Sequence, residues 1–126
     1  MNEPAMNKSI FSLCGAINSL FAAFHLYLCY QIEHLHTVLP GLRAFMHSLN
    51  LGGFLFPGFL AAAFLAFQAD LRTRLGRGLI LLGAVIYLTR ALEEFVLFPR
   101  VGWTVFGLCI IAGLLHVNAW REARSA

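Results

Sequence analysis

The chain has 126 residues, of which 60% are hydrophobic and only 12% are charged. With a mean hydropathy of +0.75, too little charge remains to cover the water-facing surface of a soluble domain. The net charge of +3 does not indicate nucleic-acid binding, because the nine Lys and Arg residues form no basic stripe with interleaved aromatics. We therefore expect one all-α integral membrane domain over residues 1–126, a four-helix bundle whose main partner is the lipid bilayer.

The first predicted membrane helix covers about residues 9–32. Its apolar stretch is longer than the roughly 7 to 15 residues of a secretory signal, so we expect a permanent span. On a helical wheel, one face collects small and polar side chains and the opposite face collects large apolar ones. Because membrane helices associate through small residues, the first face should pack against protein. Its members are Gly15, Asn18, Ser19, Ala22, Ala23, His25 and Cys29.

A second span is predicted over about residues 43–68, after a short connection that contains the helix breakers Pro40 and Gly41. Pro57 cannot donate a backbone hydrogen bond, so we expect this helix to be kinked near Pro57. One face of this helix has polar side chains near its N-terminal end and smaller side chains deeper in the membrane. That face consists of Arg43, His47, Asn50, Phe54, Gly58 and Ala61.

The third predicted span, about residues 77–98, carries Arg90, Glu93 and Glu94 inside an otherwise apolar helix. Charged groups inside a membrane are costly, so they normally face the interior and have partners. Arg90 and Glu94 are four residues apart and Tyr87 precedes Arg90 by three, so these side chains share one face with Gly83. We expect an ion pair between Arg90 and Glu94 or Glu93. A fourth, shorter span should run over about residues 103–120.

The orientation is predicted from the positive charges, because Lys and Arg are retained on the cytoplasmic side of short loops. Four crossings place both termini and the second connection on one side of the membrane. The other side has only Arg43 and Arg100. We therefore expect a multi-pass protein of the inner (plasma) membrane with cytoplasmic N- and C-termini. The charges on the cytoplasmic side are Lys8, Arg72, Arg74, Arg77, Arg121 and Arg124.

Polar residues of three spans fall at a similar depth when helical turns are counted from the outer ends. Intramembrane ionisable groups often mark functional sites, so this polar layer is the main functional signal in the sequence. The simplest interpretation is a structural network that fixes the order of the helices. The layer consists of His25, His47, Asn50, Arg90, Glu93 and Glu94.

A metal or haem site is one functional interpretation of the polar layer. Two imidazoles and two carboxylates from facing helices form a ligand set for a transition metal, with His25, His47, Glu93 and Glu94 as ligands. The two histidines alone could instead supply both axial nitrogens of a haem. The neighbouring loop sequence Glu33-His34-Leu35-His36 could deliver metal ions, but we expect it to be solvated.

A pocket for a lipophilic ligand such as a quinone is a second functional interpretation, with Arg90, Asn50 and Tyr87 as ligand-binding residues and a histidine as a further polar contact. We place His116, near the inner end of the fourth span, outside the layer and expect it to form hydrogen bonds at the membrane interface. The three cysteines lie in apolar segments without a CxxC spacing, and we expect them to be buried core residues: Cys14, Cys29 and Cys109.

The sequence therefore favours a non-catalytic membrane protein, either an accessory subunit of a larger membrane complex or a small ligand-binding module. Short loops leave little surface outside the membrane to hold a soluble substrate, and the chain has no Gly-rich phosphate loop, nucleophile elbow or His-Glu-x-x-His motif. The alternatives are a metal- or haem-dependent redox enzyme and a proton-coupled transporter formed by a homo-oligomer, both using the polar layer.

Overall fold

The computed structural model describes residues 8–125, which form four long α-helices and one short 3-10 helix. The described ranges are α1 (Lys8–Glu33), α2 (Pro40–Ala66), η1 (Asp70–Arg72), α3 (Arg74–Val96) and α4 (Trp103–Ser125). Three helices, α1 from Ser9, α2 and α4, are long and apolar enough to cross a membrane, and α3 is not among them. The expected all-helical architecture is confirmed, and the expected four spans are supported for three helices.

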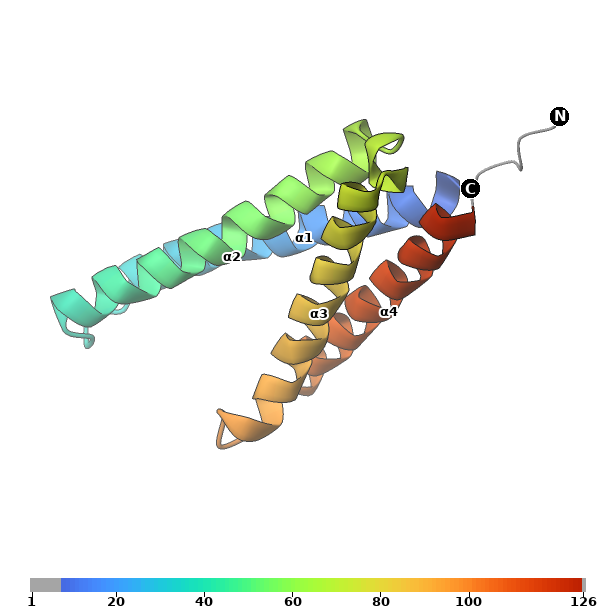
Figure 1. Ribbon diagram of the computed structural model, residues 1–126. Helices are drawn as coiled ribbons and strands as arrows, with labels where there is room; N and C mark the ends of the chain where they lie inside the picture. The colour runs from blue at the N-terminus through green and yellow to red at the C-terminus, as the bar shows by residue number, and fades with distance from the viewer. Residues whose placement is uncertain (1–7, 126) are drawn as a thin grey trace, which may run out of the picture.

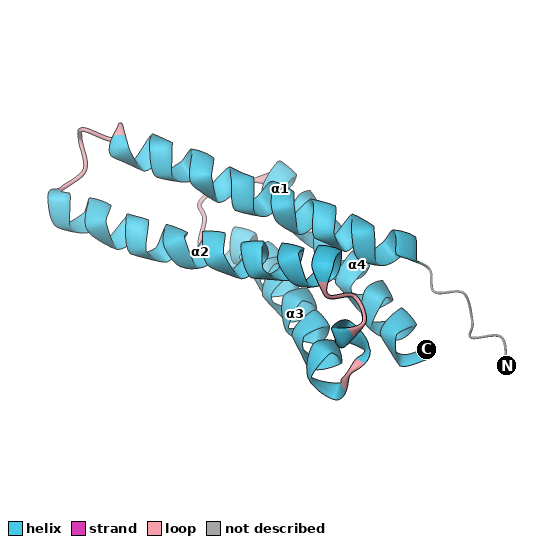
Figure 2. Cartoon of the chain, turned by 90° about the horizontal axis from the view of Figure 1, so that it is seen from above, coloured by secondary structure: helices cyan, strands magenta, loops and turns pink. Residues whose placement is uncertain are grey.

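The helices form two antiparallel hairpins, α1–α2 and α3–α4. The densest contacts lie within each hairpin, and the main contact between hairpins is that of α1 with α4. Figure 1 shows that the hairpins meet near one end and diverge towards the other. The N-terminus of α1, η1 and the C-terminus of α4 gather at the closed end, whereas the loops 34–39 and 97–102 lie apart at the open end (Figures 1 and 2).

Local sequence signals explain where the helices begin. Pro40 lies in the first turn of α2, where its missing N–H would have no intrahelical partner, so α2 begins earlier than the expected residue 43. Thr73 caps α3, because its Oγ1 accepts a hydrogen bond of 3.0 Å from the Gly76 N–H. The α2 helix is continuous through Pro57, and its ribbon shows no break in either view, so the expected kink is not confirmed (Figure 2).

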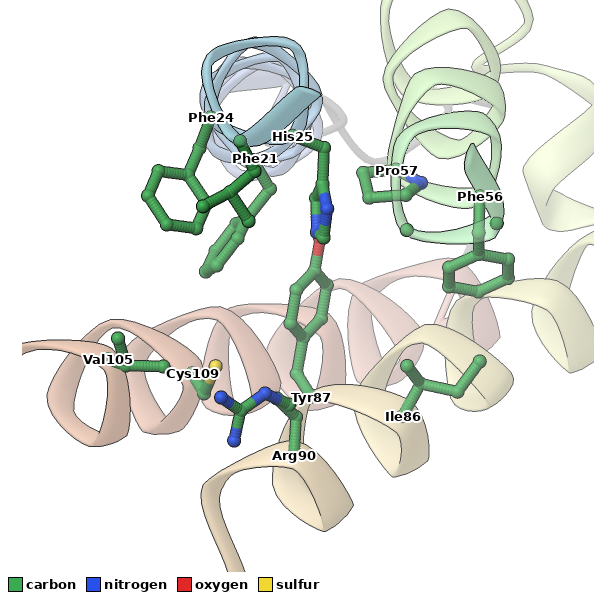
Figure 3. Close-up of a pocket in the computed structure, with 13 residues that line it drawn as sticks. Phe21, Phe24, His25, Phe56, Pro57, Ile86, Tyr87, Arg90, Val105 and Cys109 are labelled. Atoms are coloured by element: carbon green, nitrogen blue, oxygen red, sulfur yellow. The ribbon is translucent and has the colours of Figure 1, made fainter. Parts of the chain in front are cut away.

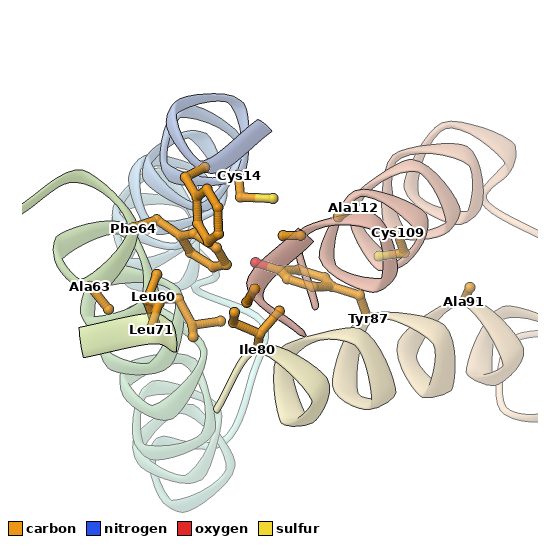
Figure 4. Close-up of a cluster of buried hydrophobic side chains, with 13 residues drawn as sticks. Cys14, Leu60, Ala63, Phe64, Leu71, Ile80, Tyr87, Ala91, Cys109 and Ala112 are labelled. Carbon is orange, nitrogen blue, oxygen red and sulfur yellow. The ribbon is translucent and has the colours of Figure 1, made fainter. Parts of the chain in front are cut away.

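The core lies at the closed end, where residues of all four helices and η1 meet. Phe11 and Phe64 pack with ring centroids 6.0 Å apart, and Leu71 of η1 is buried in the same cluster. Many other core positions are alanine or cysteine, whose small side chains let the helices approach closely (Figure 4). The expected burial of Cys14 and Cys109 is confirmed, and Cys29 is half-buried.

Large apolar side chains point outwards along the helices. Leu20 is 60% exposed, Leu49 62% and Leu92 64%. A soluble protein rarely exposes so many leucines and phenylalanines, whereas small residues inside and large apolar residues outside are typical of helices that face lipid. The distribution of side chains therefore agrees with the hydropathy in indicating a membrane-type protein.

The expected inward face of α1 is largely confirmed. Gly15, Asn18 and Ala22 are buried, but Ser19 and Ala23 are exposed. A Cβ atom placed on Gly15 would lie 2.5 Å from a methyl carbon of Leu65, so a larger residue there would have to displace the Leu65 side chain of α2. The small-residue face is therefore narrower than the wheel indicates, with Gly15 against α2 and Asn18 directed at α3 and α4.

Candidate functional site

A hydrogen-bonded network joins the two hairpins where they meet. The Tyr87 hydroxyl of α3 donates to Asn18 Oδ1 of α1 at 2.7 Å. Asn18 Nδ2 in turn donates to His116 Nε2 of α4 at 3.1 Å and to the Cys14 carbonyl at 2.7 Å. Asn18 and His116 have no exposed surface, and Tyr87 is 5% exposed. We call Asn18, Tyr87 and His116 the junction network.

The carbonyl groups around the junction network determine which atoms carry hydrogen. A carbonyl oxygen can only accept, so His116 Nδ1, which lies 2.8 Å from the Ala112 carbonyl, must be protonated. The remaining nitrogen, Nε2, is then an acceptor in the neutral ring and receives the Asn18 amide. The His116 ring also packs edge-on against Phe64, with centroids 5.2 Å apart. Both nitrogens of His116 are therefore satisfied within the protein.

A second polar group links α1 to α2 through His25 and Asn50. Asn50 Nδ2 donates to the His25 backbone carbonyl at 2.8 Å and to Cys29 Sγ at 2.9 Å. This fixes Asn50 Oδ1 as the atom that faces His25, and His25 Nδ1 donates to it at 2.7 Å. In the neutral ring His25 Nε2 is then an acceptor, and no residue in the described part of the chain donates to it.

Gly53 allows the His25 ring to approach the backbone of α2. A Cβ atom on Gly53 would collide with Cε1, Nδ1 and Nε2 of His25. The neighbouring Gly52 has open space where its Cβ would be. The position of the imidazole therefore depends on Gly53, whereas Gly52 faces an unfilled volume.

The charged residues of α3 form a third group. Arg90 Nη2 lies 2.7 Å from Glu94 Oε1, and Arg90 Nη1 lies 3.8 Å from Glu93 Oε2. The second oxygen of Glu94 accepts a hydrogen bond of 2.8 Å from the Gly102 N–H, directly before α4 begins. Glu94 is buried and thus holds the start of α4 against the end of α3. The expected contact between Arg90 and Glu94 is present.

His47 lies outside these groups. Its Nε2 is 3.0 Å from Glu33 Oε1 at the last residue of α1, so it links the two helices of the first hairpin near the open end. We expected Glu33 in the following loop and His47 beside Glu93 or Glu94. In that loop His34 and His36 are exposed, and the His34 ring packs on Tyr30 with centroids 4.2 Å apart.

A cavity of about 680 Å³ lies between the hairpins and is lined by residues of all four helices. Figure 3 shows His25 on one wall and Arg90 on the opposite wall, with Tyr87 between them and aromatic rings around. Phe24 and Ile86 on its rim are 43% and 39% exposed, so the cavity communicates with the exterior. The lining residues are Phe21, Phe24, His25, Leu28, Gly52, Gly53, Phe56, Pro57, Ile86, Tyr87, Arg90, Val105 and Cys109.

The structure separates most of the residues that the sequence places in one polar layer. Among residues 8–125, no group of three or more His, Cys, Asp or Glu side chains is arranged to hold a metal ion. His25 hydrogen-bonds to Asn50, His47 lies 3.0 Å from Glu33, and the glutamates of α3 contact Arg90 or the start of α4. The divergence of the hairpins towards the open end separates His47 from the charged residues of α3 (Figure 1). Within the first hairpin, His25 and His47 contact different partners.

Asn18 and His116 are the polar residues whose importance the sequence analysis missed. His116 was expected at the membrane interface, but it is fully buried, and α4 continues past the expected end at residue 120 to Ser125. The sequence contained a signal for each of them. Asn18 lies on the small-residue face of α1, and Gly83 of α3 leaves room for the His116 side chain. A Cβ atom on Gly83 would lie 2.7 Å from His116 Cδ2.

Taken together, the fold and the site define a helical protein of the membrane type, with two hairpins enclosing an apolar cavity that has polar groups on both walls. Comparisons with protein-family models, curated proteins and solved structures find no match for this chain.

Proposed function

We propose that this chain is a non-catalytic, multi-pass protein of the inner (plasma) membrane that binds a lipophilic small molecule between its two hairpins. The cavity carries this proposal. Its volume of about 680 Å³ lies within the range of small-molecule sites, which are mostly apolar clefts with a few polar groups that orient the ligand. Here those polar groups are His25 and Arg90, on opposite walls (Figure 3).

The route of entry follows from the divergence of the hairpins. The rim residues Phe24 and Ile86 are apolar and exposed, so a molecule dissolved in the hydrocarbon could enter without crossing a polar surface. A water-soluble substrate would have to pass the exposed leucines and phenylalanines of the outer faces. The proposed ligand therefore comes from the bilayer itself.

The membrane arrangement in this proposal counts α3 as a fourth span. Arg90 contacts both Glu93 and Glu94, and Glu94 also binds the Gly102 N–H, so each of these three side chains of α3 has a partner, although the group keeps one excess negative charge when ionised. Four spans place the arginines of the closed end in the cytoplasm and the loop 34–39 outside, in agreement with the positive charges of the connections.

The metal- and haem-dependent alternatives have less support. Both need His25 and His47 to reach one ion, and these histidines contact different partners within the first hairpin, Asn50 and Glu33. In contrast, a lipophilic ligand needs only the cavity and the groups already on its walls. The binding proposal therefore requires no rearrangement of the described residues.

A pair of glycine variants tests the proposal. Gly52 lines the cavity and Gly58 does not, and neither has an atom within 4 Å of the position of its Cβ. Gly52→Leu should fill part of the cavity, whereas Gly58→Leu adds the same side chain to the same helix outside it. We expect native mass spectrometry and organic extraction of the purified protein to show a bound lipophile in the wild type and in Gly58→Leu, and severalfold less in Gly52→Leu. Equal occupancy of the three proteins would overturn the proposal.

A further inference from the structure

We infer that the cavity selects a neutral ligand with a flat ring carrying carbonyl or hydroxyl groups, as in the quinones, and discriminates against anionic lipids. This inference rests on the proposed function and deepens it by naming the class of ligand. It concerns binding alone, with no chemical step assigned to the protein. Three features of the cavity walls support it: the net charge beside Arg90, the hydrogen-bonding groups left unused, and the aromatic lining.

The charge around Arg90 disfavours an anion. Arg90 faces the cavity, and an isolated arginine there would attract a phosphate or a carboxylate. However, Glu94 lies 2.7 Å from Arg90 Nη2, and Glu93 lies 3.8 Å from Nη1. With one positive and two negative side chains, this group carries a net negative charge when ionised. An anionic head group would therefore be repelled at the only arginine that lines the described cavity.

The unused hydrogen-bonding groups match a carbonyl and a hydroxyl. Arg90 lines the cavity, and within residues 8–125 its buried Nη1 has no hydrogen-bond partner. A turn of this side chain would therefore let Nη1 donate to an acceptor in the cavity without giving up another hydrogen bond. On the opposite wall His25 Nε2 is an acceptor, because Nδ1 is held by Asn50. A quinone carbonyl can accept from Arg90. In the reduced form, one hydroxyl oxygen can accept from Arg90 while the other hydroxyl donates to His25, so the reduced form complements both walls.

Aromatic rings form much of the remaining surface. Phe21 and Tyr87 pack with ring centroids 4.8 Å apart, and Phe24 and Phe56 line the same space. Rings of this kind bind flat unsaturated groups in offset or edge-on contacts. The open side of the cavity, at Phe24 and Ile86, leaves an apolar tail free to extend into lipid. The lining therefore favours a flat head over a flexible alkyl alcohol.

Binding of three defined probes by the purified full chain in detergent tests the inference. The probes are decylubiquinone, which has a neutral ring, dodecyl phosphate, which is anionic, and dodecanol, which is neutral without a ring. We expect decylubiquinone to bind at least about tenfold more tightly than the other two. Equal or tighter binding of dodecyl phosphate or dodecanol would overturn the inference and leave the proposed function intact. Failure of all three to bind, with an empty cavity in the purified protein, would remove both.

A single charge change distinguishes the electrostatic argument from simple size selection. Glu93 does not line the cavity and is half-buried, so Glu93→Gln should fold normally. It removes one negative charge beside Arg90 and should raise the affinity for dodecyl phosphate about threefold to tenfold, with little change for decylubiquinone. The matched control is Glu122→Gln, the same substitution in the last turns of α4. An unchanged affinity for the anion in Glu93→Gln would contradict the charge argument.

Discussion

Asn18 Oδ1 of α1 accepts a hydrogen bond of 2.7 Å from the Tyr87 hydroxyl of α3, and the Asn18 amide nitrogen donates to His116 Nε2 of α4 at 3.1 Å. One short side chain thus connects three helices and both hairpins. Each hairpin is held together along its length by its own contacts, but the hairpins share a much smaller area, mainly between α1 and α4. Loss of this network should therefore loosen the angle between the hairpins before it unfolds either one.

Replacing Asn18 by leucine should lower the stability of the folded chain. The Tyr87 hydroxyl and His116 Nε2 would each lose a buried partner, and we expect the free energy of unfolding to fall by about 1–3 kcal/mol. Thermal unfolding in detergent, followed by circular dichroism, measures the change. Ser19→Ala is the control, because Ser19 Oγ bonds only to Gly15 in its own helix. Equal melting temperatures for the two variants would argue against the network.

Gly83→Ala should be more destabilising than Gly78→Ala in the same helix. Both changes improve helix propensity by up to about 1 kcal/mol. At Gly83 the new methyl group would meet the His116 ring, which cannot move aside without breaking its bonds to Asn18 and Ala112, whereas Gly78 has open space. We expect Gly78→Ala to melt at or above the wild-type temperature and Gly83→Ala below it. The reverse order would be incompatible with the packing of His116.

Arg90→Leu should be worse than the double variant Arg90→Leu, Glu94→Gln. Removing arginine alone leaves the buried Glu94 without its counter-charge, and breaking a fully buried pair costs about 3–5 kcal/mol. The loss here should be smaller because the Arg90 side chain is 36% exposed. Glutamine removes the charge and can still accept from the Gly102 N–H. Yield and thermal unfolding should recover in the double variant, and no recovery would contradict the pairing.

The orientation of the chain can be measured with reporters. A tag inserted near Thr37, in the loop at the open end, should be accessible from outside the cell. A reporter fused after Ala126, which lies outside the described residues, should behave as cytoplasmic, because the positive charges of the closed end are retained there. The opposite labelling pattern would reverse the proposed topology.

Spin labels can test the divergence of the hairpins. A pair at Thr37 and Arg100 reports on the two loops of the open end, and a pair at Ala69 and Ser125 reports on the closed end; all four positions are exposed. Pulsed dipolar spectroscopy in lipid should give a longer distance for the first pair than for the second (Figure 1). A distance for the first pair as short as that for the second would mean that the cavity closes in lipid.

Periodicity predicted which side of each helix faces protein. The wheel correctly placed Gly83, Tyr87 and Glu94 on the buried side of α3, and Asn50 and Ala61 on that of α2. These faces follow from local spacing alone, because residues three or four apart lie on one side of a helix. The ion pair of Arg90 with Glu94 was predictable for the same reason.

The separation of His47 from the charged residues of α3 was not predictable in this way. Counting turns along a helix gives only the depth of a residue. The distance between two residues at the same depth also depends on the angle between their hairpins, and this angle depends on how the contact surfaces of the hairpins fit. The sequence also contained a competing partner for His47, Glu33, which we assigned to a loop although α1 extends to include it. Small errors at the helix ends thus misdirected the assignment of both His47 and His116.

The concentration of contacts within each hairpin has a consequence for how the chain is made. Residues of α1 and α2 are complete before the ribosome reaches α3, so the first pair of helices can associate during synthesis. At that stage the Asn18 amide nitrogen already has the Cys14 carbonyl, but its oxygen has no donor until Tyr87 arrives. An unsatisfied polar group in hydrocarbon costs several kcal/mol. A chain that stops after α2 should therefore carry a defect that the finished chain lacks, and that defect would mark it as incomplete.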